Sequence, residues 1–134
     1  MASFSEGTDE RFPESIVLFA HGSRDPLWRK PIEAIAARAR ALAPQTQVRC
    51  AYLELTAPSL PDCVAELAQH GSHAIKVVPL FLGVGRHARE DLPVIMAELT
   101  AHHPHIKFKL DPAIGEDNRL VDLVAHMALS AHAD

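Results

Sequence analysis

The fold of this chain is decided by two stretches of similar design, Ile16-Val-Leu-Phe-Ala-His21 and Ile75-Lys-Val-Val-Pro-Leu-Phe-Leu-Gly-Val-Gly-Arg-His87. In each stretch, an apolar run typical of a buried strand ends close to a histidine. A third apolar run, at 48–53, ends directly before Glu54, which lies 33 residues from each histidine. Because about 30 residues make one strand-plus-helix unit, this spacing predicts a chain of repeating βα units.

Helical periodicity fills the segments between the apolar runs. Apolar residues recur there at three- and four-residue spacing, which predicts helices at about 27–43, 60–70, 89–102 and from 118 onward. The expected strands are 15–20, 48–53, 74–82 and 105–110. This alternation predicts an α/β fold, in which a four-stranded parallel sheet is flanked by helices in a flavodoxin-like layering.

Two prolines and one apolar stripe allow more detailed predictions about these elements. Pro79 cannot donate to a strand ladder, so we expect it near the end of the strand at 74–82. Pro93 is expected in the first turn of the helix that starts at about 89. The last helix is expected to pack on the sheet through one stripe, made of Leu120, Val121, Val124, Met127 and Ala128.

The composition is that of an ordinary globular domain, with 134 residues, 48% hydrophobic and 22% charged. We expect residues 1–14 to be a disordered tail and residues 15–134 to be one domain. The net charge of −4, without a Lys/Arg cluster, argues against nucleic-acid binding, and no apolar run approaches the ~20 residues of a membrane span. Without a secretory signal, the cytoplasm is the expected location, with Cys50 and Cys63 as buried thiols.

The candidate site consists of His21, Glu54 and His87, each of which follows one of the apolar runs. Ligands bind to parallel sheets outside the carboxyl ends of the strands, so these three side chains are expected to converge there. A neutral imidazole either binds a divalent metal or accepts a proton, and a carboxylate does the same. Three protein ligands with a free coordination position would make a catalytic or transit metal site. Proton transfer is the open alternative.

Four arginines flank the two histidines: Arg24 and Arg29 follow His21, and Arg86 and Arg89 lie on either side of His87. A guanidinium group pairs with a carboxylate through two parallel hydrogen bonds. On an acidic protein, this local basic charge favours a polyanionic ligand. The alternative is that the arginines are solvated and pair with neighbouring acidic residues.

The glycine segment 83–88 also matches a nucleotide-binding pattern. Gly83-Val-Gly-Arg-His-Ala88 fits G-x-G-x-x-A between a strand and a helix. However, it follows the third strand rather than the first, and it places His87 inside the loop that would hold phosphate. The sequence contains no G-x-x-x-x-G-K-[ST] motif. We therefore expect neither ATP nor another nucleotide, and keep a nucleotide-binding module as a minor alternative.

Three motifs in order resemble those of the short CbiX-type sirohydrochlorin chelatases, over about residues 15–130. The motifs are Phe19-Ala-His-Gly-Ser-Arg-Asp-Pro26, Tyr52-Leu-Glu-Leu with Pro58-Ser-Leu60, and Val78-Pro-Leu-Phe-Leu-Gly with Gly85-Arg-His-Ala-Arg-Glu-Asp-Leu-Pro93. The resemblance implies a chelatase-like fold and an ATP-independent class II enzyme. Such an enzyme inserts a divalent metal into sirohydrochlorin, a tetrapyrrole with eight carboxylates.

The resemblance also implies roles for individual residues. His21 and His87 would be the metal-binding and proton-accepting histidines, and Glu54 matches an acidic residue of related chelatases. The motif residues Ser23 and Gly85 would contact the substrate together with the four arginines. Short members of the family are homodimers, which a single copy of the unit fits. Arg86 departs from the family pattern, since a smaller or apolar residue is more usual before the histidine.

Two questions stay open at the level of sequence. A non-catalytic carrier of a tetrapyrrole or a metal on the same fold would present the same residues. The metal is also undetermined, because Co²⁺, Fe²⁺ and Ni²⁺ all accept imidazole and carboxylate ligands. Cobalt is favoured by family association alone, so cobalamin, siroheme and nickel-cofactor pathways are all compatible with the sequence.

Overall fold

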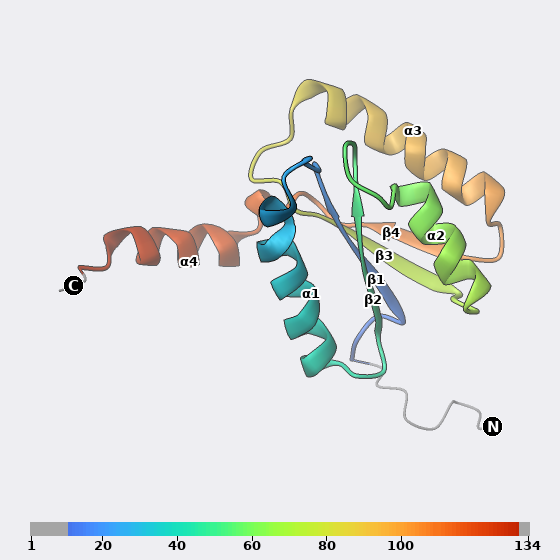
Figure 1. The fold of residues 1–134 in the computed structure, drawn as a ribbon, viewed down its shortest axis with the longest axis horizontal. Helices are drawn as coiled ribbons and strands as arrows, with labels where there is room; N and C mark the ends of the chain where they lie inside the picture. The colour runs from blue at the N-terminus through green and yellow to red at the C-terminus, as the bar shows by residue number, and fades with distance from the viewer. Residues whose placement is uncertain (1–10, 132–134) are drawn as a thin grey trace.

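A four-stranded parallel sheet forms the centre of the computed structural model, which describes residues 11–131. The strand order is β2-β1-β3-β4, and the strands are β1 (Ser15–Ala20), β2 (Gln47–Tyr52), β3 (Ala74–Pro79) and β4 (Lys107–Leu110). Helices cover both faces of the sheet (Figure 1), so the predicted α/β fold is confirmed. Most of the expected disordered tail, residues 1–10, and the last residues, 132–134, lie outside the described part.

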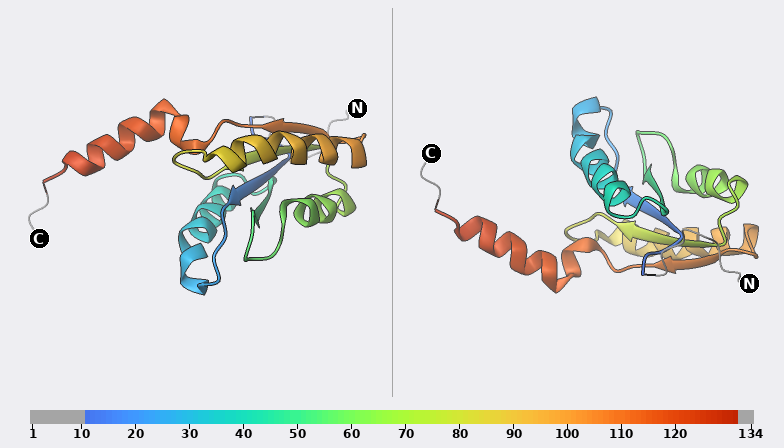
Figure 2. Two further views of the ribbon diagram at one scale, coloured as in Figure 1. Left: turned by 90° about the horizontal axis from the view of Figure 1, so that it is seen from above. Right: turned by 90° about the horizontal axis from the view of Figure 1, so that it is seen from below.

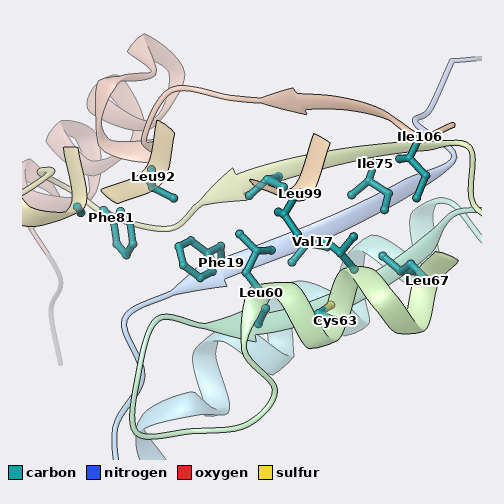
Figure 3. Packing of buried hydrophobic residues seen from close by; sticks show 14 of the residues in the cluster. Val17, Phe19, Leu60, Cys63, Leu67, Ile75, Phe81, Leu92, Leu99 and Ile106 are labelled. Carbon is teal, nitrogen blue, oxygen red and sulfur yellow. The ribbon is translucent and has the colours of Figure 1, made fainter. Parts of the chain in front are cut away.

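The helices divide between the two faces of the sheet. They are the 3-10 helix η1 (Pro26–Arg29), α1 (Lys30–Leu42), α2 (Leu60–Gln69), α3 (Arg86–His102), the 3-10 helix η2 (Ile114–Glu116) and α4 (Asn118–Leu129). α2 and α3 pack on one face, where Val17 and Phe19 of β1 point toward them (Figure 3). On the opposite face, Leu18 packs against Ala36 of α1.

β3 ends three residues before the predicted end at 82, whereas the start of α2 follows the sequence prediction. Pro79 is the last residue of β3, at the end of the strand as expected, since it has no N–H to donate to the ladder. The side chain of Ser59 caps α2 by accepting a hydrogen bond from the backbone N–H of Asp62, at 3.2 Å. Val64 and Leu67 then lie in the buried stripe of α2.

α3 begins at Arg86, three residues before the expected start, so Pro93 lies inside the helix and not in its first turn. The cause is the burial of Ala88, which packs into the same core cluster as Leu92 one turn later. This packing extends the helix toward its N-terminus past the position that Pro93 suggested. His87 is consequently a helical residue in the first turn of α3.

The expected packing of the last helix on the sheet is wrong. None of the α4 residues is buried, and Val121 and Met127 are 54% and 64% exposed. Figures 1 and 2 show α4 extending away from the sheet. Periodicity reports an apolar face, but it does not identify the surface against which that face packs.

The two cysteines are free thiols, as expected, although only Cys63 is fully buried and Cys50 is half-buried. Burial raises the pKa of the Cys63 thiol to about 12. Within residues 11–131, no helix combines the length and apolar character needed to cross a membrane.

Candidate functional site

The candidate residues lie at one edge of the sheet, where β1 and β2 end and α3 begins (Figure 1). His21 directly follows β1, and Glu54 lies two residues after the end of β2. The backbone N–H of Glu54 donates to the carbonyl of His21 at 3.0 Å, so these two residues are neighbours. His87 reaches the same edge from the first turn of α3.

A threonine joins the segment after β1 to the segment after β2. The Oγ1 of Thr56 donates to the carbonyl oxygen of Ser23 at 2.6 Å and accepts from the N–H of Ser23 at 3.0 Å. Together with the Glu54–His21 bond, these contacts connect the two segments at two points. We call residues 21–25 the His21 segment.

Gly22 permits this close approach. Its φ of 102° is in the left-handed region, which side chains rarely adopt. A Cβ at this position would lie 1.8 Å from the carbonyl oxygen of Glu54. Leu55, on the facing segment, also has a left-handed φ of 65°, which costs energy for a leucine. Backbone strain and close packing therefore occur together beside His21.

The imidazole of His21 packs on a buried aromatic ring. Its centroid lies 4.4 Å from that of Phe81, with the rings tilted by 43°. Phe81 is 2% exposed and has an edge-on contact with Phe19 of the core, at 6.0 Å. His21 itself is exposed, and its side chain forms no hydrogen bond within residues 11–131. The ring is thus supported on one face while its nitrogens stay available to a ligand.

His87 has a different environment. It is exposed in the first turn of α3, after a segment, residues 82–85, that we call the glycine segment. Leu82 in this segment is 77% exposed, and a Cβ at Gly83 or Gly85 would meet no atom within 4 Å. The glycine segment is therefore open on its outer side, unlike the surroundings of Gly22.

The three candidate ligands do not form a preassembled metal cage. Within residues 11–131, no three His, Cys, Asp or Glu side chains lie close enough together to hold one metal ion. His21 and Glu54 are joined through their backbones, and His87 comes from a separate element. The structure thus brings the residues to one edge of the sheet without arranging them as a three-ligand set.

The four candidate arginines are divided over this edge. Arg24 is exposed and has no ion-pair partner in the part of the chain that the structure describes. Beside His87, Arg86 pairs with Glu90 at 3.2 Å, and the Nη1 of Arg89 donates to the carbonyl of Val84 at 2.9 Å. The sequence left open whether these arginines pair with acidic neighbours or offer their charge to a ligand. Arg86 pairs with an acidic neighbour, whereas Arg24 has no ion-pair partner within residues 11–131.

Arg29 lies in a separate polar cleft, where it pairs with Glu33 at 3.5 Å. The cleft is also lined by Arg40, Cys50 and Tyr52. Burial raises the pKa of the Cys50 thiol and of the Tyr52 hydroxyl. Arg29 is therefore placed over β2, on a different side of the edge from His87.

Two residues of this edge were not predicted from the sequence. Thr56 holds the His21 segment, but a threonine two residues after a glutamate carries no distinguishing pattern. Phe81 supports the His21 ring, but in the sequence it is one more apolar residue of a buried run. Both act through another residue, and such contacts become visible only in three dimensions.

Comparison with known proteins identifies one family and relatives that are named as chelatases. The sequence profile of the CbiX family matches residues 15–131. A sirohydrochlorin cobaltochelatase from Methanopyrus kandleri is 34% identical over 61% of this chain and 57% of its own length. A chloroplastic sirohydrochlorin ferrochelatase from Arabidopsis thaliana is 28% identical over 83% of this chain and 49% of its own length. The chain therefore spans about half the length of these relatives.

Among solved structures, a CbiX protein from Marinobacter aquaeolei has the same fold, with a TM-score of 0.75. It is 34% identical to this chain, and the match covers 85% of this chain and 92% of that one.

Proposed function

The chain belongs to the CbiX family, and from this premise we propose that it inserts a divalent metal ion into sirohydrochlorin without ATP. Relatives named as sirohydrochlorin cobaltochelatase and ferrochelatase support the reaction class. The observation that carries the proposal is the exposed imidazole of His21, supported by Phe81 and free of hydrogen bonds within residues 11–131. A ring held in this way meets a flat substrate without first breaking a contact.

Insertion of a divalent ion replaces two pyrrole N–H protons, so two protons must leave as the metal enters. We assign proton acceptance to His21 and His87, because a neutral imidazole accepts a proton near neutral pH. The first protein-bound position of the incoming ion would be on Glu54 or on one of these imidazoles; if an imidazole holds the ion, Glu54 would accept the proton in its place. Product formation then releases the metallated macrocycle, and the imidazoles return their protons to water.

The lack of a three-ligand cage within residues 11–131 fits this reaction. The macrocycle supplies four nitrogen ligands, so the protein needs to offer only one or two more, on a face of the ring. A closed protein site would hold the ion too tightly to pass it on. Glu54, linked to His21 through the backbone, would serve as an oxygen ligand or as a second proton acceptor.

The carboxylates of the substrate have partners at this edge. Arg24, Arg86 and Arg89 are exposed, and the N-cap residue of α3, Gly85, provides no side-chain cap. Free N–H groups at a helix N-terminus attract negative charge. We propose that these groups and Ser23 contact the substrate carboxylates. Arg29 would reach them from the cleft over β2, after releasing Glu33.

We also propose that the protein works as a homodimer in the cytoplasm. The match covers 49% of the Arabidopsis relative, so two copies of this chain would supply about as much chain as that one relative. Cobalt is the favoured metal, with Fe²⁺ and Ni²⁺ as alternatives, since relatives are named for both cobalt and iron.

The test is the absorption spectrum of sirohydrochlorin with Co²⁺, recorded anaerobically with and without the protein. A metallation rate well above the spontaneous rate supports the chelatase, and repetition with Fe²⁺ and Ni²⁺ ranks the metals. A spectrum that shifts on binding without any gain in rate would indicate a carrier instead. A rise in Tm with NAD or NADP but not with the tetrapyrrole would indicate a nucleotide-binding module.

A further inference from the structure

Phe81 connects the core to both histidines of the candidate site. Its ring packs against the imidazole of His21, with the centroids 4.4 Å apart, and has an edge-on contact with Phe19 at 6.0 Å. Figure 3 shows Phe81 and Phe19 on the same side of the sheet. The next residue, Leu82, begins the glycine segment, which leads to His87. The position of the backbone at Phe81 and Leu82 therefore affects the surroundings of both histidines.

The 3-10 helix η2 holds this stretch of backbone. β3 ends at Pro79, two residues before Phe81. The carbonyl of Phe81 accepts a hydrogen bond from the backbone N–H of Gly115, at 3.0 Å, and Gly115 is the middle residue of η2. η2 therefore fixes the chain just beyond the end of the strand, where the sheet no longer does so.

Gly115 lets η2 approach this backbone more closely than a residue with a side chain would. A Cβ at Gly115 would lie 1.8 Å from the carbonyl oxygen of Leu82, 2.4 Å from its carbonyl carbon and 2.5 Å from its Cα. All three are backbone atoms, so a change of rotamer would not relieve the clash. The φ of Gly115 lies outside the left-handed region, so its backbone conformation does not require glycine. The contact with Leu82 is the feature that requires it.

η2 is itself anchored to the core, so it serves as a fixed support. Ala113, directly before η2, is 4% exposed and belongs to the same core cluster as Phe81. The backbone N–H of Asp111 donates to the carbonyl of Val77 in β3 at 3.0 Å, and the N–H of Glu116 closes the turn on the carbonyl of Ala113 at 2.9 Å. The glycine segment, in contrast, is open on its outer side. A side chain at position 115 would therefore displace the glycine segment rather than η2.

We propose that Gly115 is a positioning residue for metal insertion, because it lets η2 fix the backbone at Phe81 and Leu82 and thereby holds the ring of Phe81 against His21. Gly115 acts through Phe81 and does not itself take part in proton transfer. A proton acceptor works only when it is correctly placed, and displacements of about 1 Å reduce rates strongly. The role of Gly115 in insertion rests on the proposed function, whereas its effect on the surroundings of His21 does not.

A purely structural role is the alternative for Gly115. In that case a substitution would lower the Tm, but the folded protein would keep the wild-type surroundings of His21 and the wild-type rate. A positioning role changes both of these quantities in the folded protein. Measurements on folded variants therefore separate the two roles.

The NMR signals of the His21 ring protons test the position of the imidazole directly. An aromatic ring shifts the resonances of protons beside it, so these signals report the contact with Phe81. They are assigned by their loss in His21→Ala. Gly115→Ala should move them toward their position in Phe81→Leu, which lacks the ring. Glu116→Ala is the matched control and should leave them unchanged, because this exposed side chain forms no hydrogen bond or ion pair within residues 11–131.

The rate of anaerobic Co²⁺ insertion into sirohydrochlorin tests the consequence for the reaction. At saturating substrate, Gly115→Ala should lower the rate about tenfold or more, while the dissociation constant of the tetrapyrrole stays within about threefold. Phe81→Leu should also lower the rate. The double variant should be no slower than the slower single variant, because both residues act through one contact. Glu116→Ala should retain the wild-type rate.

Ala113→Gly provides a second variant if Gly115→Ala does not fold. It weakens the anchor of η2 without placing a new atom against the backbone of Leu82. Circular dichroism should show a native fold. The His21 signals should move in the same direction as in Gly115→Ala, and the rate should fall by a smaller factor.

Three results would overturn the proposal. Wild-type His21 signals in the folded variants would show that η2 does not hold Phe81 against His21. Shifted signals with an unchanged rate would show that this contact does not matter for insertion. Losses that multiply in the double variant would show that Gly115 and Phe81 act separately. If wild type itself does not exceed the spontaneous rate, the proposed function fails together with the role of Gly115 in insertion, and the NMR comparison still decides whether Gly115 positions His21.

Discussion

The segment after β1 and the segment after β3 each bring a histidine to the same edge of the sheet, but they are built differently. The His21 segment is connected to its neighbour by Thr56 and Gly22, and its imidazole packs on Phe81. The glycine segment before His87 is open on its outer side, with Leu82 77% exposed. The contrast teaches that one imidazole is preorganised on a buried ring, whereas the other stands exposed on the first turn of a helix.

The preorganised His21 segment is accompanied by backbone strain, in contrast to the open glycine segment before His87. The strained backbone at Leu55 and the close approach at Gly22 both lie beside His21. Strain of this kind persists only where surrounding contacts hold it, and it concentrates at functional sites. We therefore expect substitutions on the His21 side to change stability and activity together, and substitutions on the His87 side to change activity alone.

The largest effect is expected for Gly22→Ala. The new Cβ would meet the carbonyl oxygen of Glu54, and the left-handed φ adds strain. We expect a loss of about 3 kcal/mol of stability, measured by urea unfolding, together with the loss of metal insertion. Gly83→Ala is the control, since its Cβ meets no atom within 4 Å and should leave stability within about 0.5 kcal/mol. Equal losses in the two variants would remove the contrast between the segments.

His87→Ala should reduce the insertion rate without affecting the fold. Loss of a proton-accepting group typically costs about 10²- to 10⁴-fold in rate. His87 is exposed, so its removal leaves the core intact and the Tm should stay within about 2 °C of wild type. A large fall in Tm would show instead that His87 has a structural role.

Thr56→Val should have an intermediate effect on both quantities. The substitution keeps the shape of the side chain but removes both contacts with Ser23. We expect a loss of about 1–3 kcal/mol of stability and a tenfold or larger loss of rate, because the His21 segment would move. Thr56→Ser, which keeps the hydroxyl, should restore most of the rate. If the valine variant is as active as wild type, Thr56 does not position His21.

The smallest effect is expected for Leu55→Gly. Relief of the left-handed φ contributes about 1–2 kcal/mol, and the added freedom of glycine in the unfolded chain offsets about half of it. The variant should therefore be more stable than wild type by roughly 0.5 kcal/mol. A clear loss of stability by denaturant titration would show that the Leu55 side chain, not its backbone strain, dominates.

The sequence predicts the sheet because segments with apolar residues alternate along the chain with segments of helical periodicity. It also places His21, Glu54 and His87 at one edge, since strand ends in a parallel sheet meet there. The start of α3 was missed because the packing of Ala88 outweighed the local signal of Pro93. The Thr56 and Phe81 contacts depend on segments far apart in sequence, which no local pattern reports.

Hydrophobic periodicity does not predict the orientation of α4, for a different reason. Its stripe was identified correctly as apolar, but the tight packing of Gly115 on the backbone of Leu82 turns the helix away from its own sheet. An amphipathic pattern indicates that one face of a helix packs against another surface. It does not indicate whether that surface belongs to the same chain.

The central claim is that the preorganised imidazole of His21 carries the metal insertion. It is tested by measuring anaerobic Co²⁺ insertion and sirohydrochlorin binding on the same samples of wild type and His21→Ala. We predict that both proteins bind the tetrapyrrole, that wild type exceeds the spontaneous rate by a wide margin, and that His21→Ala falls close to it. Equal insertion rates in the two folded proteins would contradict the account.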